Sequence, residues 1–175
     1  MNQEAVEMIK KGGLVVMATD TIYGILASAL NERAMKKLSR LRRHDTKKPF
    51  IILIGAVEEL TKFGIELTPA QKEQIEKLWP GPVSVILGHQ AFRLPASPEL
   101  QEFLKATGRI AAPSANLPGE PPATTVAEAL AYFGTEIDLY VDSGKVIGNP
   151  STLVSLDENG DLTMLRGILA NHGKK

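Results

Sequence analysis

Short apolar runs alternate along the chain with segments in which apolar residues recur every three or four positions. The runs predict strands at residues 14–18, 25–30, 50–54, 83–87, 92–94, 109–112, 139–141, 152–156 and 162–165. Helical spacing predicts helices near residues 5–9, 34–41, 57–63, 69–78, 98–108 and 125–134. Strands that alternate with helices are typical of an α/β fold. The last two strands predict a hairpin with Asn159-Gly160 at its turn, so we expect a mixed sheet.

Polar residues mark several of the predicted helix ends. Asn31 is a side chain that caps helix N-termini well. Thr68 and Gln71 have the spacing of a capping box, with a proline between them at the first helical position. Thr125 and Glu128 predict a second capping box. The predicted helices at 57–63 and 125–134 both end at a glycine, which is typical of helix C-termini.

Length and composition predict one globular domain. With 175 residues the chain can bury a sizeable core, and we expect a single domain over residues 1–175 in which residues 168–175 are a frayed tail. No apolar run approaches the ~20 residues of a membrane helix, so we expect no membrane association. The absence of cysteine excludes disulfides and Cys-ligated zinc, and it suits a reducing, cytoplasmic location.

Three loops rich in polar residues, proline or glycine lie at the edges of predicted strands. The loop at residues 111–119 contains Ser114 and Asn116, which place a hydroxyl and a carboxamide beside backbone N–H groups. The loop at 19–24 has two threonines around an aspartate, and residues 79–82 read Trp-Pro-Gly-Pro. Such groups gathered in one concavity bind anions or nucleotides, so these loops predict a cleft.

The net charge is zero, but basic residues are concentrated in one segment. Residues 33–48 contain eight Lys or Arg and a single acid, Asp45. The first half of this segment has the spacing of a solvated helix face. The second half, residues 42–48, continues past the predicted helix into a loop before a strand. There, a positive local field indicates a site for an anion.

Several common kinds of active site are absent from the sequence. There is no Walker A loop, no Gly-x-Gly-x-x-Gly fingerprint and no Gly-x-Ser-x-Gly elbow around Ser114. A triad of Ser114 with His44 or His89 is formally possible, but no spacing favours it. The three histidines lack the spacing of metal ligands. We therefore expect no metal ligands from the protein and, if a metal takes part, a hard cation that phosphate oxygens bring in.

Seven short segments now form an ordered set. They are residues 19–24, the basic segment 42–49, Trp-Pro-Gly-Pro at 79–82, Arg93-x-Pro95, Ala-Pro-Ser-Ala-Asn at 112–116, Ser-Thr at 151–152 and Leu-Arg-Gly at 165–167. In these segments and their order the chain resembles the YrdC/TsaC family of threonylcarbamoyl-adenylate synthases, from about residue 13 to 167. The resemblance implies a short, single-domain form. It also implies an α/β fold with a twisted mixed parallel and antiparallel sheet, flanking helices and an open central cleft.

The resemblance also implies a reaction and its partners. The substrates would be L-threonine, bicarbonate and ATP, with Mg²⁺ carried by the ATP, and the products threonylcarbamoyl-AMP and pyrophosphate. A separate tRNA threonylcarbamoyl transferase complex would then modify adenosine 37 of tRNA. Because the substrates supply their own nucleophile, no covalent protein nucleophile is expected, and catalysis would depend on positioning and charge stabilisation.

The resemblance assigns residues to two groups of contacts. ATP is expected to meet Arg42, His44, Lys48, Ser84, Ser114, Asn116 and Arg166, the first three stabilising charge on the leaving group. L-Threonine is expected to meet Thr21, Arg93, Ala112, Ser151 and Thr152. His44 stands where the family has arginine, and a neutral imidazole cannot make bidentate phosphate contacts.

Two other functions fit the same sequence. The basic segment 33–48 could make the chain a non-catalytic RNA-binding module, including one that binds tRNA weakly, although stacking aromatic residues are few. The departures from the family's usual residues, such as His44, would also fit a diverged enzyme that forms a different carbamoyl-adenylate.

Overall fold

The computed structural model describes residues 2–43 and 49–169 of the chain. The described residues form nine strands: β1 (Val15–Ala18), β2 (Tyr23–Ser28), β3 (Ile52–Leu53), β4 (Val83–Leu87), β5 (Gln90–Arg93), β6 (Ile110–Ala111), β7 (Leu139–Tyr140), β8 (Thr152–Leu156) and β9 (Leu162–Arg166). The helices are α1 (Gln3–Lys10), α2 (Glu32–Leu41), α3 (Pro69–Leu78), α4 (Pro98–Thr107) and α5 (Val126–Phe133), with 3₁₀ helices η1 (Val57–Phe63) and η2 (Gly134–Glu136).

The strands form one mixed sheet in the order β7-β1-β2-β6-β3-β5-β4-β8-β9. β1 pairs with β7, β3 with β5, and β4 with β8 in parallel, whereas the other neighbours are antiparallel. The mixed sheet predicted from the sequence is therefore confirmed. Its two middle strands, β6 and β3, contain only two residues each.

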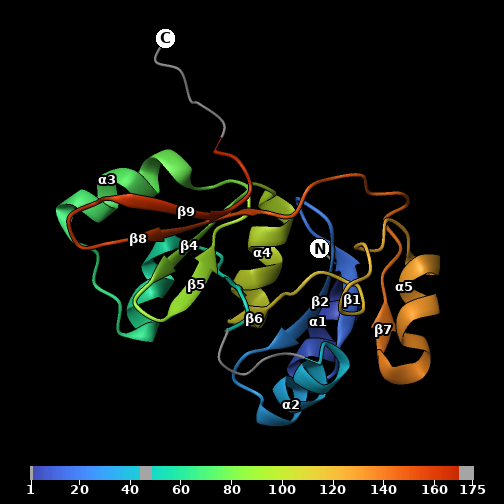
Figure 1. Ribbon diagram of the computed structural model, residues 1–175. Coiled ribbons are helices and arrows are strands. Elements are labelled where there is room, and N and C mark those ends of the chain that lie inside the picture. The colour runs from blue at the N-terminus through green and yellow to red at the C-terminus, as the bar shows by residue number, and fades with distance from the viewer. Residues whose placement is uncertain (1, 44–48, 170–175) are drawn as a thin grey trace.

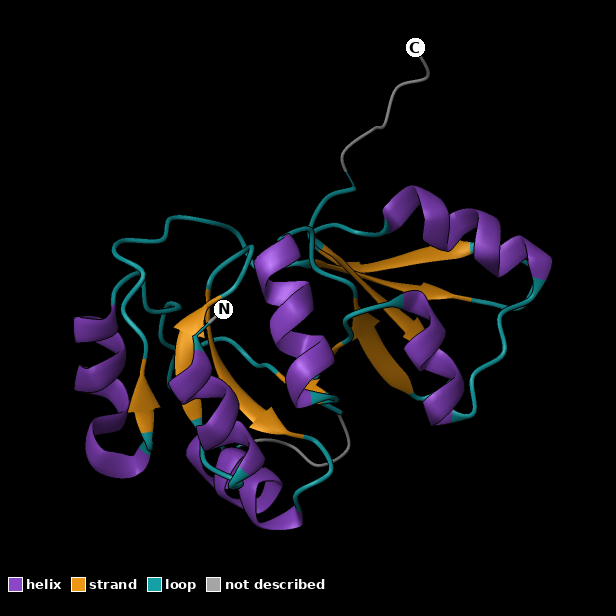
Figure 2. Cartoon of the chain, turned by 180° about the vertical axis from the view of Figure 1, so that it is seen from behind, coloured by secondary structure: helices purple, strands orange, loops and turns teal. Residues whose placement is uncertain are grey.

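The short middle strands divide the sheet into two groups of strands. Figures 1 and 2 show β7, β1 and β2 with α1, α2 and α5 in one half, and β4, β5, β8 and β9 with α3 in the other. Helix α4 stands between the two groups and contacts α1. Loops that end strands of both halves can therefore meet near β6 and β3.

Helices cover both faces of the β1–β2 half, and the residues of these strands alternate between two cores. Val16 and Ile25 belong to the larger core with residues of α2, α3 and α5. Val15 and Leu26 belong to the smaller core with residues of α1 and α4. This alternation follows from the two-residue period of a strand. Burial on both faces explains why these strands read as continuous apolar runs.

Capping explains where several helices begin. The Thr68 hydroxyl accepts from Gln71 N at 3.1 Å, and Gln71 Oε1 accepts from Thr68 N at 3.0 Å, so this capping box is confirmed. Asn31 caps α2 through Ala34 N, as predicted. Only one bond of the second predicted capping box forms. The Thr125 hydroxyl accepts from Glu128 N, but the Glu128 carboxylate accepts from Thr124 N and not from the N-cap residue Thr125, so this part of the prediction is wrong.

Tertiary pairing shifts some predicted elements. β2 begins at residue 23 instead of 25, because its first residues pair with β1 across a tight four-residue loop. The run at 50–54 contributes only a two-residue strand, which pairs with two residues of β6 on one side and two residues of β5 on the other. Residues 57–63 form a 3₁₀ helix that ends at Gly64, whose φ of 72° is left-handed. No helix in the described part of the chain is both long and apolar enough to span a bilayer.

The start of α3 yields a first test of these local interactions. The Thr68 hydroxyl also donates to Glu158 O in the β8–β9 turn at 2.9 Å, so it joins the helix to the hairpin. We expect Thr68→Ala to lower the free energy of unfolding by about 1–2 kcal/mol and Thr68→Ser to restore most of it. Urea denaturation measures both, and an unchanged value for Thr68→Ala would show that packing alone holds this helix end.

Candidate active site

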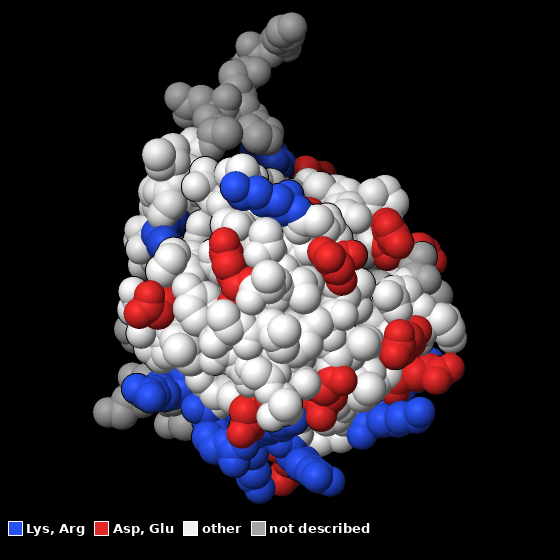
Figure 3. Space-filling view, turned by 90° about the vertical axis from the view of Figure 1, so that its right-hand side faces the viewer, with Lys and Arg blue, Asp and Glu red and all other residues white. Residues whose placement is uncertain are grey.

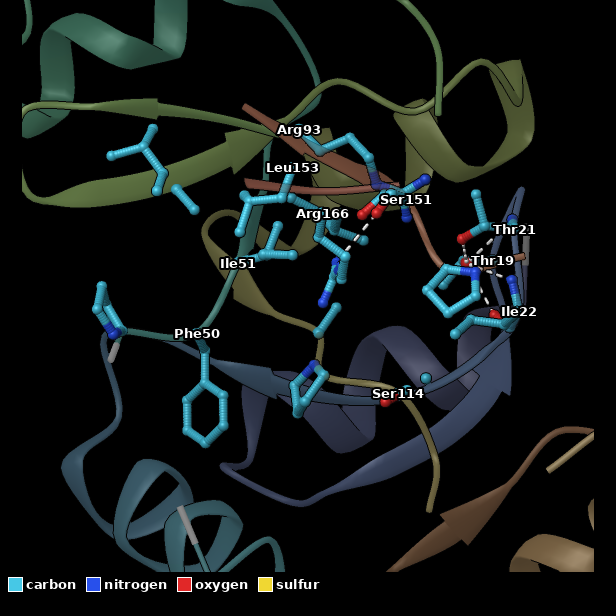
Figure 4. A pocket seen from close by; sticks show the side chains of 18 of the residues that line it. Thr19, Thr21, Ile22, Phe50, Ile51, Arg93, Ser114, Ser151, Leu153 and Arg166 are labelled. Atoms are coloured by element: carbon cyan, nitrogen blue, oxygen red, sulfur yellow. Dashed lines mark hydrogen bonds between the residues drawn. The ribbon is translucent and has the colours of Figure 1, made fainter. Parts of the chain in front are cut away.

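A pocket of about 540 Å³ lies where the two halves of the sheet meet. Figure 4 shows that side chains reach it from strands and loops far apart in the sequence. Its lining comes from the β1–β2 loop, the end of α2 with residues 49–53, the β4–β5 hairpin, the loop after β6, and the β8–β9 hairpin with the residues just before it. The predicted cleft is present and two of the three polar loops line it, whereas residues 79–82 do not.

The pocket brings together seven of the predicted site residues: Thr21, Arg42, Arg93, Ala112, Ser114, Ser151 and Arg166. Three more, Ser84, Asn116 and Thr152, are buried behind its lining. His44 and Lys48 lie outside the described residues. The sequence did not single out several apolar residues of the lining, among them Phe50, Ile86 and Leu165, because their pattern is that of ordinary strands.

Strand pairing beyond β6 places the Ser114 loop against the start of β2. Ile25 N donates to Pro113 O and Ala115 N donates to Tyr23 O, each at 2.9 Å. Gly24 and Ser114 form an isolated bridge between these bonds. A Cβ on Gly24 would come within 3.3 Å of Pro113 O, so glycine allows this close approach.

Asn116 holds two pocket residues from behind. Its Oδ1 accepts from Ser114 Oγ at 2.6 Å and from Arg42 Nη1 at 2.9 Å, and its backbone O accepts from Arg42 as well. Its Nδ2 donates to the carbonyls of Leu117 and Glu120. Because both N–H groups and Oδ1 are engaged, the contacts of Asn116 orient Arg42 and Ser114.

Arg42 is itself half-buried at the end of α2. Burial lowers the pKa of its guanidinium from the usual value. Its Nε is buried and has no hydrogen-bond acceptor among the residues that the structure describes. Because Nε is buried, a ligand would have to bind the Nη groups of this guanidinium.

The hydroxyls near β8 also form a chain of contacts. Ser84 Oγ lies 2.8 Å from Ser151 Oγ, and Ser84 is fully buried, so Ser151 separates it from the pocket. Arg166 Nη2 donates to Ser151 O at 3.0 Å (Figure 4). Thr152 Oγ1 donates to Ile168 O and faces away from this group. Of the two candidate hydroxyls, Ser151 is the one that reaches the pocket.

Arg93 forms a buried ion pair with Asp20, a residue to which the sequence assigned no role. Arg93 Nη1 donates to Asp20 Oδ1 at 2.6 Å, and the two side chains are only 5% and 9% exposed. Asp20 Oδ2 accepts from Ala96 N at 2.9 Å. Burial lowers the pKa of Arg93, and the charge and hydrogen bond of Asp20 oppose that shift.

These contacts divide the pocket electrostatically. Asp20 neutralises Arg93, whereas Arg42 and Arg166 donate to neutral acceptors and form no ion pair within residues 2–43 and 49–169. No described residue of the lining is acidic. Arg42 and Arg166 thus bring uncompensated positive charge to the pocket, whereas the charge of Arg93 is paired.

The basic face of α2 is more nearly neutral than its sequence indicates. Lys36 pairs with Glu32, Lys37 with Asp138, and Arg40 with Glu136. Figure 3 shows Lys and Arg side chains gathered over the α2 end of the molecule, with acidic side chains among them. Burial acts to raise the pKa of Asp138, but bonds from Leu14 N and Lys37 and the nearby positive charges bring it below its usual value. This face therefore offers little uncompensated charge for a polyanion.

Residues 2–43 and 49–169 contain no group of three or more His, Cys, Asp or Glu side chains that could hold a metal ion. Two of the three histidines, His44 and His172, lie outside the described residues. The third, His89, lines the pocket from the turn between β4 and β5.

Comparison with known proteins identifies the family. The family model Sua5_yciO_yrdC, described as telomere recombination, matches residues 7–167. The chain therefore belongs to the Sua5/YciO/YrdC family, and the predicted resemblance is confirmed.

Relatives and a solved structure agree with this assignment. A Methanocaldococcus jannaschii protein named putative threonylcarbamoyl-AMP synthase is 28% identical over 95% of this chain and 87% of its own length. The threonylcarbamoyl-AMP synthase of Pyrococcus abyssi is 31% identical over 88% of the chain, which spans half of that relative. The structure of Pyrococcus abyssi Sua5 complexed with L-threonine matches with a TM-score of 0.83 and 29% identity, over 93% of this chain and 52% of the other.

The Asp20–Arg93 pair yields a stability prediction. Removing one partner of a buried ion pair leaves the other charge without compensation, so we expect Asp20→Ala to lower the free energy of unfolding by about 3–5 kcal/mol. Asp161→Ala, at an exposed aspartate of the β8–β9 turn, is the matched control and should change it little. Urea denaturation of the three proteins gives the comparison, and equal losses in both variants would contradict the assigned role.

Proposed function

We propose that this protein is an L-threonylcarbamoyladenylate synthase, a nucleotidyltransferase that makes threonylcarbamoyl-AMP and pyrophosphate from L-threonine, bicarbonate and ATP. The observation that carries the proposal is the division of the pocket between unpaired arginines and a neutralised one. A triphosphate needs uncompensated positive charge, whereas an amino acid is neutral overall and needs a balanced site. The names of the relatives support the same reaction.

The unpaired arginines suit the nucleotide. In the proposed step, the amino group of L-threonine and bicarbonate first form threonylcarbamate with loss of water, and an oxygen of its carbamate group then attacks the α-phosphorus of ATP. The bond from that phosphorus to the bridging oxygen breaks, and pyrophosphate leaves with the negative charge that develops. Arg42 and Arg166 can stabilise that charge, and Ser114, which shares the partner Asn116 with Arg42, also lines the pocket. The reaction needs no protein nucleophile, in keeping with positioning as the main contribution of the site.

The paired arginine suits the amino acid. Arg93 can donate to a carboxylate while Asp20 holds the rest of its guanidinium. Thr21 and Ser151 supply hydroxyls in the same pocket, and the structure of Pyrococcus abyssi Sua5 complexed with L-threonine supports threonine as the substrate. The assignments of Thr21, Arg93 and Ser151 remain proposals.

Magnesium would enter this site with the nucleotide. The described lining contains no carboxylate that could serve as a ligand, and Mg²⁺ prefers oxygen ligands such as phosphates and water. We therefore treat MgATP as the substrate. The product would pass to a tRNA threonylcarbamoyl transferase complex, and since ATP, threonine and tRNA occur together in the cytoplasm, we propose that location.

Threonine-dependent pyrophosphate release tests the proposed reaction. We expect the purified protein with MgATP, bicarbonate and L-threonine to release pyrophosphate, and release to fall to background when either L-threonine or bicarbonate is left out. Release that ignores L-threonine would contradict the assignment and favour an enzyme that forms a different carbamoyl-adenylate. RNA binding that falls steeply with salt, without pyrophosphate release, would favour the RNA-binding alternative.

Substitution of the unpaired arginines tests the nucleotide site. A hydrogen bond to a charged group contributes about 1.5–3 kcal/mol, so Arg42→Ala and Arg166→Ala should each weaken ATP binding about tenfold or more. Arg33→Ala, on the exposed face of α2, is the matched control and should leave ATP affinity unchanged. Calorimetric titration with ATP measures all three, and unchanged affinity in both pocket variants would exclude this placement of the triphosphate.

A further inference from the structure

The β1–β2 loop contains two threonines whose hydroxyls are in contact. Thr19 Oγ1 and Thr21 Oγ1 lie 3.0 Å apart, and Thr19 Oγ1 lies 2.8 Å from the carbonyl oxygen of Ile22. Thr19 Oγ1 also lies 3.3 Å from the backbone N of both Thr21 and Ile22. Figure 4 shows this group at the edge of the pocket, where both threonines belong to the lining.

The positions of the protons in this group follow from which atoms can donate. A carbonyl oxygen has no proton, so the 2.8 Å contact between Thr19 Oγ1 and Ile22 O requires the single hydroxyl proton of Thr19. The backbone N–H groups of Thr21 and Ile22 also donate to Thr19 Oγ1, so this oxygen acts as an acceptor on that side and the donor of the hydroxyl–hydroxyl bond is Thr21. Thr21 Oγ1 has therefore used its only donor inside the loop, and toward a ligand it can only accept.

We infer that Thr19 is a positioning residue that fixes the Thr21 hydroxyl as an acceptor, so that the bound amino acid must present an N–H or O–H group to Thr21. The inference rests on the proposed function and adds to it which kind of substrate group is recognised at this point. Thr19 acts through Thr21, because its own hydroxyl proton is engaged with the backbone.

The Asp20–Arg93 pair, whose aspartate lies in the same loop, complements this acceptor. Arg93 has only donors and suits a carboxylate, whereas Thr21 Oγ1 offers only lone pairs and suits a donor. A ligand with a carboxylate and a nearby N–H or O–H satisfies both. A phosphate or a simple carboxylate cannot, because its acceptor oxygens would face the lone pairs of Thr21.

Variants of Thr19 test the positioning role. Thr19→Val keeps the shape of the side chain and frees the proton of Thr21, so the Kd for L-threonine should rise about tenfold. Thr19→Ser keeps the hydroxyl and should remain within threefold of wild type. Thr61→Val is the matched control, because Thr61 Oγ1 also donates to a backbone carbonyl, that of Glu58, but lies outside the pocket. Calorimetric titrations with L-threonine and with ATP measure each protein.

Comparing the affinities for L-threonine and for ATP distinguishes a positioning role of Thr19 from a general disruption of the pocket. A rise in the Kd for L-threonine in Thr19→Val, with the Kd for ATP within twofold of wild type and rescue by serine, supports the inference. An unchanged Kd for L-threonine, a parallel loss of ATP affinity, or no rescue by serine overturns it. If the wild-type protein binds no L-threonine, the proposed function fails together with the inference.

A ligand-side measurement needs no change at Thr19. Thr21→Val removes the acceptor, and we expect it to weaken L-threonine binding about tenfold. O-methyl-L-threonine keeps the side-chain oxygen but loses its O–H. If that O–H donates to Thr21, the wild-type protein should bind O-methyl-L-threonine at least fivefold more weakly than L-threonine. In Thr21→Val, which lacks the acceptor, the two ligands should differ less than twofold. If the amino group is the donor, methylation has the same effect on both proteins. Unchanged L-threonine affinity in Thr21→Val overturns the inference.

Discussion

The pocket depends on one buried ion pair that joins the two halves of the sheet. Asp20 lies in the loop between β1 and β2, whereas Arg93 ends β5 in the other half. The strands between these halves, β6 and β3, have two residues each, so few backbone hydrogen bonds cross the middle of the sheet. The pair adds a cross-link there, and its burial makes the loss of either partner costly. It also sets the net charge of the pocket wall that it helps to build.

The remaining chemistry of the pocket follows from which arginines are neutralised. Arg93 has a carboxylate partner, whereas Arg42 and Arg166 bond to neutral oxygens among the described residues. One cavity can therefore bind a polyanion near the unpaired arginines and a neutral amino acid near the paired one, because the electrostatic potential differs between these arginines. Hydroxyls of the loops then refine the site, because their donor or acceptor character is set by neighbouring backbone groups. In this account the contribution of the protein is arrangement, and the substrates supply the reacting groups.

Local features were predicted from the sequence more accurately than features set by distant pairing. The Thr68–Gln71 capping box depends on four consecutive residues, and it forms as predicted. The start of β2 was misplaced because pairing with β1 determines it. The family resemblance selected seven residues that line one pocket, but it could not show that Ser84 and Asn116 lie behind the lining. The partnership of Asp20 with Arg93 spans 73 positions, and no local pattern reveals it.

The proposed reaction requires that one pocket hold the triphosphate against the unpaired arginines and the amino acid against the paired one. A crystal structure with a non-hydrolysable ATP analogue and L-threonine tests it most directly. The account predicts phosphate oxygens within hydrogen-bond distance of Arg42 and Arg166, and the threonine carboxylate on Arg93 with an N–H or O–H facing Thr21. A nucleotide bound elsewhere on the molecule, or phosphates on Arg93 and threonine on Arg42, would contradict it.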